Sequence, residues 1–416
     1  MDHSGPGRVV VLFSAAARVP SVNNPHHQRA HASARQLSQL LRRGSTVLLL
    51  VGGILGTACR PSQPSTPQPV SRRYAFVSNG KSDTVTVVNL DGFRVERTVA
   101  VGHDPSGVTA SPLRNEVYVV NTGSGSVSVL NAETLKVEAT IPVGQSPFAL
   151  ELSPDGKAAY VANAGSGNVS VVDLEARRVR RTIPTGRRPG EARVSPDGKL
   201  LAVSNRDDGT ITLIDLGRMA KLADVPVGKE PGPMAILPDG SQLFVANSGS
   251  GNVSAVDLQS YKLLTHLATG KTPVDLAVKP DGGELFVPNF DSDSVTVINT
   301  YADEVALNLM AGSHPSRVIV DSSGTFLYVS NFGSNNVSVV RIFDRRVLAS
   351  IAVGTGPDAL RLTPDERYLL VLNALSNEMA VLDTSVPFLV TLVPLGLSPH
   401  DVAVKTFRGP PATRQR

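Results

Sequence analysis

The chain has 416 residues with one Cys, no Trp and a hydrophobic share of 41%, a composition typical of a globular body with further segments attached. Its net charge of +4 is unevenly spread. Residues 1–73 hold nine Arg and one acidic residue, and residues 408–416 hold three Arg, so residues 74–407 carry 28 basic and 35 acidic side chains. Because the basic excess belongs to the two ends, the charge does not favour a nucleic-acid partner.

The N-terminal part divides into segments of different composition. Residues 1–41 have a mixed His, Arg and Ser composition without periodicity, and we interpret them as disordered or as an extension upstream of the true translation start. Residues 42–59 begin with Arg42-Arg43, continue through a short uncharged stretch and end at Cys59. This order is typical of a secretory signal and is too short to span a bilayer comfortably.

The end of this signal resembles a lipobox. The residues are Leu55-Gly56-Thr57-Ala58-Cys59, with Gly56 where Leu is usual and Leu55 one place early. The resemblance implies a lipidated Cys59 and an exported lipoprotein, in the periplasm or at the outer membrane or cell surface, whose only membrane contact is its lipid anchor. A plain signal peptide with an incidental Cys is the alternative. Residues 60–73, rich in Pro and Ser, predict an extended tether, and residues 408–416 a disordered tail.

Between the tether and the tail, a unit recurs every 42 residues without insertion or deletion. A fixed period of this length indicates a repeat architecture. Its markers are eight Asn, each tolerant of tight turns, and eight Gly, each followed three places on by Pro. The Asn are Asn79, Asn121, Asn163, Asn205, Asn247, Asn289, Asn331 and Asn373; the Gly are Gly102, Gly144, Gly186, Gly228, Gly270, Gly312, Gly354 and Gly396.

Each unit contains four short runs rich in Val, Ile, Thr and Tyr. In the unit that begins at Gly144, the runs predict strands over 148–153, 158–163, 168–174 and 179–184, separated by turn residues. Amphipathic helical periodicity is absent from the repeats. Four strands in each unit of this length predict an all-β fold, a β-propeller in which each unit forms one blade.

The repeats resemble those of the YVTN-type β-propeller proteins. The resemblance lies in Tyr118–Asn121, Tyr160–Asn163 and Phe244–Asn247, and in the Ser-Pro-Asp-Gly turns at 153–156 and 195–198. It covers about four fifths of the chain and implies a propeller. That family includes surface-layer and binding proteins as well as lactonase-like relatives, so the resemblance leaves the function open.

The order of the strands predicts how the ring closes. The first element, Tyr74–Asn79, corresponds to a second strand, and the last, His400–Phe407, to a first strand. Pairing of the two would build one blade from both ends of the chain and remove a free edge. The count then gives eight blades over residues 74–407. Seven blades with a spare unit outside the ring is the alternative.

Strand alternation predicts which innermost positions face the central channel. We number places from each repeat Gly: places six and eight are apolar and predict contacts between blades, whereas places five, seven and nine predict channel-facing side chains. Charged residues at and near place five break the repeat. Together they predict a ligand-binding site at the channel mouth, suited to a small polar or anionic ligand or an envelope protein: Glu191, Asp275, His314, Arg317, Asp358, His400 and Asp401.

Metal binding and catalysis are weaker hypotheses. His103, His314 and His400 each follow a repeat Gly closely and could ligate a divalent metal together with Asp401 or Asp358. Asp291-Ser292-Asp293 could contact Ca²⁺ but lacks a twelve-residue calcium loop. No other cofactor is implied, and several common enzyme motifs are missing.

Two functions follow from these features. The first is a non-catalytic binding or scaffold propeller, tethered in a bacterial cell envelope and with no catalytic residues. The second is a metal-dependent, lactonase-like hydrolase, whose candidate residues at the channel mouth are Glu191, Asp275, His314 and Asp401. The lack of an established ligand spacing favours the first.

Overall fold

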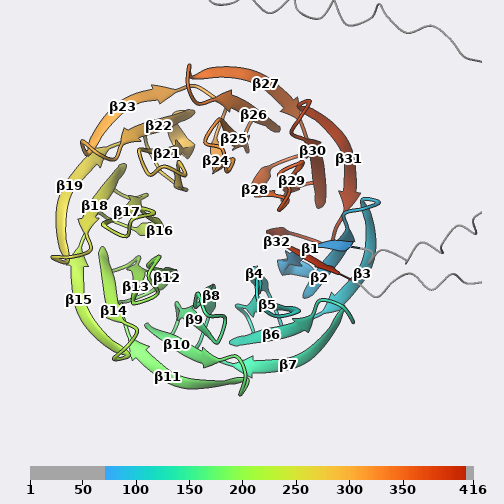
Figure 1. Cartoon of the computed structure of the whole chain (residues 1–416), viewed down its shortest axis with the longest axis horizontal. Helices are drawn as coiled ribbons and strands as arrows, with labels where there is room; N and C mark the ends of the chain where they lie inside the picture. The colour runs from blue at the N-terminus through green and yellow to red at the C-terminus, as the bar shows by residue number, and fades with distance from the viewer. Residues whose placement is uncertain (1–70, 409–416) are drawn as a thin grey trace, which may run out of the picture. The chain divides into compact units, whose positions relative to one another are not determined.

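The computed structural model describes residues 71–408 of the protein, so Cys59, the predicted signal, residues 60–70 and residues 409–416 lie outside the described residues. Residues 71–408 form eight sheets of four antiparallel strands around a ring (Figure 1). The eight-bladed propeller is therefore confirmed, and the seven-bladed alternative is wrong. Two short 3₁₀ turns, Gly80–Ser82 and Phe290–Ser292, interrupt the all-β pattern. Within this part of the chain, no helix has the length and apolar character that a membrane crossing requires.

Seven blades are consecutive along the chain and are numbered here in that order. Blade 1 holds β4 (Pro105–Ala110), β5 (Glu116–Asn121), β6 (Ser126–Asn131) and β7 (Lys136–Pro142). Blade 2 holds β8 (Pro147–Leu152), β9 (Ala158–Asn163), β10 (Asn168–Asp173) and β11 (Arg178–Pro184). Blade 3 holds β12 (Pro189–Val194), β13 (Leu200–Asn205), β14 (Thr210–Asp215) and β15 (Ala220–Pro226). Blade 4 holds β16 (Pro231–Ile236), β17 (Gln242–Asn247), β18 (Asn252–Asp257) and β19 (Lys262–Ala268).

The remaining blades follow the same plan. Blade 5 holds β20 (Ala277–Val278), β21 (Glu284–Asn289), β22 (Ser294–Asn299) and β23 (Glu304–Leu309). Blade 6 holds β24 (Pro315–Val320), β25 (Phe326–Asn331), β26 (Asn336–Arg341) and β27 (Arg346–Ala352). Blade 7 holds β28 (Pro357–Leu362), β29 (Tyr368–Asn373), β30 (Glu378–Asp383) and β31 (Phe388–Pro394). The closing blade 8 holds β32 (Pro399–Arg408), β1 (Ser71–Asn79), β2 (Thr84–Asn89) and β3 (Arg94–Ala100).

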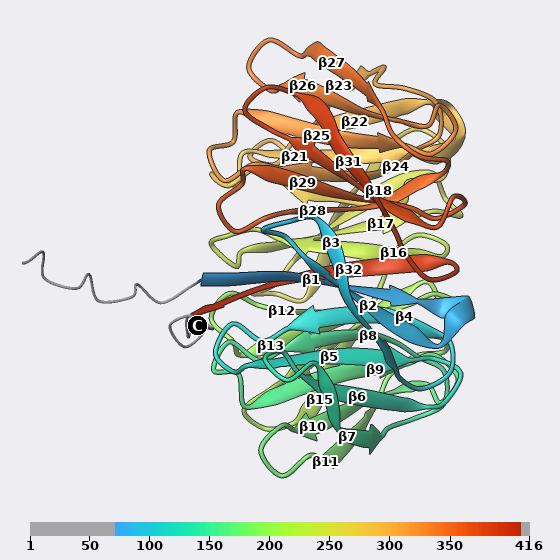
Figure 2. The same ribbon diagram turned by 90° about the vertical axis from the view of Figure 1, so that its right-hand side faces the viewer.

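Blade 8 joins the two ends of the chain, as predicted. Strand β32 pairs with β1 in antiparallel register from Ser71↔Arg408 to Asn79↔Pro399. This pairing corrects two boundaries, because residues 71–73 of the expected tether and residue 408 of the expected tail belong to strands. Neither end has to turn into a neighbouring strand there, so the two can pair beyond the length of an ordinary blade strand. Figure 2 shows the start of β1 and the end of β32 on the same side of the ring.

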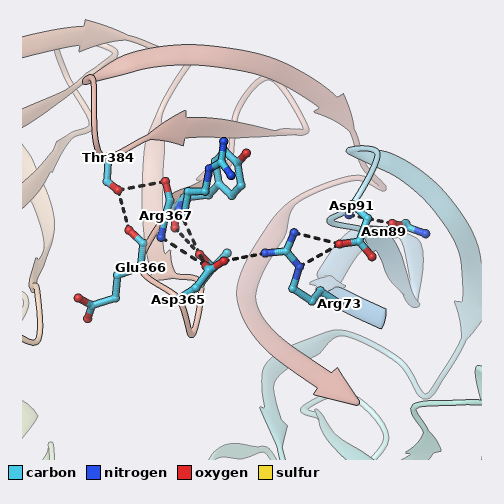
Figure 3. Close-up of polar contacts among 9 residues, drawn as sticks. Arg73, Asn89, Asp91, Asp365, Glu366, Arg367 and Thr384 are labelled. Atoms are coloured by element: carbon cyan, nitrogen blue, oxygen red, sulfur yellow. Dashed lines mark hydrogen bonds and ion pairs between the residues drawn. The ribbon is translucent and has the colours of Figure 1, made fainter. Parts of the chain in front are cut away.

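A further contact ties blade 8 to blade 7 on that side. Arg73 of β1 donates to Asp91 at 2.9 Å and to Asp365 of the β28–β29 turn at 2.8 Å (Figure 3). The Gly-x-x-Pro turns and the loops after each repeat Asn lie on the opposite face of the ring, here called the mouth face. The second strand of every blade ends at this face and the first strand begins there.

The repeat Asn and the repeat Gly of each blade contact each other. All eight Asn are fully buried, and Asn163, for example, donates to Asn168 at 2.8 Å and to Ser170 at 2.9 Å. Its Oδ1 accepts from the backbone N–H of Gly144 at 3.0 Å. A Cβ on Gly144 would lie 2.5 Å from the Asn163 side chain, and the other repeat Gly face their Asn at similar distances. The Asn–Gly pairs are therefore scaffold, as their regular spacing predicted.

The core consists of apolar clusters between neighbouring blades. Val108 at place six packs with Phe76 and Val119, which confirms the contacts expected for this place. Small residues at places five and seven lie against the next blade instead of the channel: Ala359 and Ala403 are both buried.

Candidate functional site

A cavity of about 1060 Å³ opens on the mouth face and is lined by residues of blades 1 to 7. Its charged lining residues come from blades 3, 6 and 7 and comprise four Arg and three acidic residues: Arg187, Arg188, Glu191, Arg206, Asp207, Arg317 and Asp358. An excess of guanidinium groups in a concave site suits an anionic ligand, because each guanidinium can donate two parallel hydrogen bonds.

Two of these Arg are engaged in close ion pairs. Arg206 contacts Glu230 at 2.6 Å. Arg187 pairs with Asp208, which also accepts from the Arg187 backbone N–H at 2.6 Å. These pairs fix the loops of blade 3 and its neighbour at the edge of the cavity.

The other two Arg are only loosely paired. Arg188 lies 3.7 Å from Asp207, and its side chain is 61% exposed. Arg317 lies 3.9 Å from both Asp275 and Asp358, distances too long for hydrogen bonds. Among the described residues, its guanidinium makes one hydrogen bond, at 3.4 Å to the Val274 carbonyl. Both groups therefore retain donors for a ligand.

Aromatic rings border the same cavity. Phe148 at place four of blade 2 lines it with 53% of its surface exposed. Phe290 lines the side of blade 5. Its ring centroid lies 4.8 Å from that of His314 and 5.9 Å from that of Phe332, so three rings cluster at the rim. The cavity thus combines cationic and apolar surface.

The structure separates the seven predicted site residues into three sets. Glu191, Arg317 and Asp358 line the cavity. Asp275 and Asp401 are not among the lining residues and bridge blades: Asp275 accepts from the Val318 N–H at 3.0 Å, and Asp401 accepts from the Val108 N–H at 3.1 Å. Burial raises the pKa of Asp275, although the Arg317 guanidinium opposes that shift.

The two predicted His lie at the rim, outside the lining of the cavity. His314 packs on Phe290, and its backbone N–H donates to Asp293 at 2.7 Å. The His400 ring lies against Gly80, where an added Cβ would come within 2.8 Å of it. The predicted residues therefore do not converge on a single point.

Below the cavity, the channel holds a second group of charges. Arg193 contacts Glu191 at 2.9 Å and Glu151 at 3.7 Å. Burial raises the pKa of Glu151. Arg361 donates to the Val402 carbonyl of the closing strand at 3.0 Å. Arg193 and Glu191 belong to the same strand, β12, whereas the Arg193–Glu151 and Arg361–Val402 contacts run between neighbouring blades.

Metal binding receives no support from residues 71–408, which contain no group of three or more His, Cys, Asp and Glu placed to hold an ion. His103 contacts Asp83 at 2.8 Å. Asp293 has a φ of 53° and occupies a place that is Gly in four other units; it caps the next turn through the His314 N–H. The Asp-Ser-Asp sequence is thus explained by loop structure.

Sequence reasoning missed Arg187, Arg188 and Phe148 as lining residues. The sequence did contain a signal for them. The unit that begins at Gly186 is the only one with two basic residues, Arg187 and Arg188, directly after its repeat Gly. Place four carries an aromatic side chain in only two units, as Phe148 and His400. Treating places one, two and four as mouth-facing, like place five, would have found them.

Comparisons with known proteins agree with the fold. A family model described as YNCE-like beta-propeller matches residues 109–408. No curated protein matches the chain with significance. Among solved structures, hydrazine synthase of Kuenenia stuttgartiensis is 26% identical with a TM-score of 0.56, over 69% of this chain and 98% of that one.

Two more distant structures share the fold alone. Dihydro-heme d1 dehydrogenase NirN, in complex with DHE, is 16% identical with a TM-score of 0.69, over 83% of this chain and 76% of that one. A functionally unknown protein from Desulfotomaculum acetoxidans is 15% identical with a TM-score of 0.56, over 80% of this chain and 98% of that one.

Proposed function

Since the chain belongs to the YNCE-like β-propeller family, whose match spans most of the ring, we propose that it is a non-catalytic binding propeller of the bacterial cell envelope. It is tethered through Cys59 and holds a small anionic ligand at the channel mouth. The observation that carries the proposal is the loose pairing of Arg188 and Arg317 in a cavity of about 1060 Å³. The hydrolase alternative has no comparable support, because its candidates are divided between cavity, rim and channel.

The ligand proposal is tested with a simple dianion. Suberate is titrated into the protein and into the double variant Arg188→Ala/Arg317→Ala by calorimetry. Charge-assisted hydrogen bonds contribute about 1.5–3 kcal/mol each, so we expect affinity to fall at least tenfold. Arg180→Ala/Arg181→Ala, which removes two exposed charges from the outer strand β11, is the matched control and should bind like the parent. Equal binding by parent and double variant would exclude the mouth as the anion site.

The envelope proposal is tested separately through Cys59. We expect the full-length protein, expressed in a bacterium, to partition into detergent, because two or more acyl chains each contribute about 0.8 kcal/mol per buried methylene. Cys59→Ser should be released or left unprocessed. If both proteins fractionate identically as soluble species, the plain signal peptide replaces the lipoprotein interpretation.

A further inference from the structure

The side chain at place four, on the mouth face, differs in size from blade to blade. Place four carries a side chain in six units: Ser106, Phe148, Val274, Ser316, Asp358 and His400. In the adjacent blades 3 and 4 it is Gly190 and Gly232, and both line the cavity. At these two blades, no side chain at place four occupies the cavity.

Neither glycine is required by the backbone. Both lack the positive φ that disfavours other residues. A Cβ at Gly232 would meet no atom within 4 Å, and one at Gly190 would meet only Ser204 Oγ at 3.4 Å. By contrast, a Cβ at the repeat residue Gly144 would clash with Asn163 at 2.5 Å. The fold has room for side chains at both places, so what their absence provides is open space.

Both glycines lie at a bulge of the innermost strand. The ladder between β12 and β13 passes from Pro189↔Asn205 to Ala192↔Val203, and that between β16 and β17 from Pro231↔Asn247 to Met234↔Val245. The register shifts by one residue in both ladders, as it does in blades 1, 2, 6 and 7. Bare backbone at a bulge is a surface that a flat group can approach closely.

A ring and two cations line the same cavity as the two glycines. Phe148 lies at place four of the preceding blade with 53% of its surface exposed. Arg188 precedes Gly190 by two residues, and Arg317 lines the cavity from blade 6. The cavity volume of about 1060 Å³ is at the upper end of the roughly 300–1,000 Å³ usual for small-molecule pockets, which is more space than a simple anion needs.

We infer that the ligand is a planar, ring-bearing anion: its ring lies over Gly190 and Gly232 beside Phe148, and its acidic groups reach Arg188 and Arg317. Offset or edge-on contact with an exposed ring favours a flat partner over a flexible chain. The inference rests on the proposed function, because it names the chemical class of the ligand bound at that site.

The experiment compares two dicarboxylates of equal charge. Naphthalene-2,6-dicarboxylate supplies a planar ring, and suberate supplies a flexible chain of similar span. We expect the full-length protein to bind the naphthalene compound about tenfold more tightly, a preference of 1.4 kcal/mol. In Gly232→Leu, which fills the open space, that preference should disappear, because the affinity for the naphthalene compound falls about tenfold more than the affinity for suberate.

Controls separate the possible failures. Gly217→Leu, at an exposed turn of blade 3 on the opposite face, should keep the preference, and thermal melts verify that each variant is folded. Phe148→Ala should also abolish the preference for the naphthalene compound, because it removes the aromatic ring of the proposed site. Equal affinities for the two compounds, or a preference untouched by Gly232→Leu, would overturn the inference and leave Arg-dependent anion binding intact. If neither compound binds at millimolar concentration, the inference and the ligand part of the proposed function fail together.

Discussion

The closing blade and the channel mouth both depart from the repeat, yet they satisfy their charges differently. At the closing blade, Lys405 donates to the carbonyls of Ser111 and Arg114 in blade 1, the second at 2.6 Å, and Arg73 donates to Asp365 in blade 7 at 2.8 Å. At the mouth, Arg188 and Arg317 lie 3.7 Å or more from their acidic neighbours.

This contrast separates two uses of an irregular residue. A polar group that breaks the repeat and finds close partners within the protein is stabilising the ring, because burial without partners would cost free energy. A polar group that breaks the repeat in a cavity and lacks close partners within the protein is available to bind a ligand. The comparison predicts that substitutions at the closing blade change stability, whereas substitutions at the mouth change binding.

Removal of the closing strand should have the largest effect. Deleting residues 399–416 takes β32 from blade 8 and leaves the inner edge of β1 unpaired along its whole length. The neighbouring blades also lose packing, since Val402 and Ala403 belong to their shared cores. We expect loss of cooperative unfolding in urea, because a ring of blades depends on neighbour contacts. An unchanged transition would contradict closure by the chain ends.

Lys405 should come next. It is a buried residue, 8% exposed, at place nine of the closing strand, and burial lowers the pKa of its ammonium group. Lys405→Met keeps the packing but leaves two carbonyls without their donor, at a cost of about 2 kcal/mol in the free energy of unfolding. Lys199→Met, at a side chain 82% exposed, is the control. Equal stability of the two variants would remove Lys405 from the closing contacts.

Asp275 of blade 5 combines both kinds of contact, because its carboxylate accepts a hydrogen bond from blade 6 and also faces Arg317. Burial raises its pKa, so its negative charge is lost at a higher pH than for an exposed Asp, and Arg317 then has fewer competitors for an anion. Affinity for naphthalene-2,6-disulfonate, a dianion at every pH tested, should rise about threefold from pH 7 to pH 5. In Asp275→Asn, the affinity should be high and flat with pH. A slope unchanged in this variant would show that Asp275 is not the source of the pH dependence.

The fold was predictable because the repeat is strict. Asn163 and Gly144 can be recognised at constant spacing, and their burial against each other explains why that spacing is invariant. The bounds of the closing strands were harder to predict, since pairing at residues 71–73 requires no particular side chain.

The site was predicted only in part. The repeat spacing assigns Asp275, Arg317 and Asp401 to the same place, place five. It does not predict how far each side chain extends or whether a neighbouring backbone N–H donates to it. Arg317 and Asp358 line the cavity, whereas Asp401 is held by Val108. The open space at Gly232 could not be predicted either, because the sequence alone does not show whether the backbone or the packing requires a glycine at a given place.

The smallest predicted effect belongs to Arg73, and it sets the scale for the closing contacts. Its side chain is 24% exposed, and its partners Asp91 and Asp365 are 44% and 48% exposed, so water and salt weaken both pairs. We expect Arg73→Ala to lower the free energy of unfolding by about 0.5 kcal/mol at low salt and by less in 1 M NaCl. Arg72→Ala, at an exposed neighbour in the same strand, controls for the loss of charge. If Arg73→Ala costs as much as Lys405→Met, ion pairing across blades 7 and 8 would rank with the buried lysine as a closing contact. If it costs nothing even at low salt, closure would depend on strand pairing and Lys405 alone.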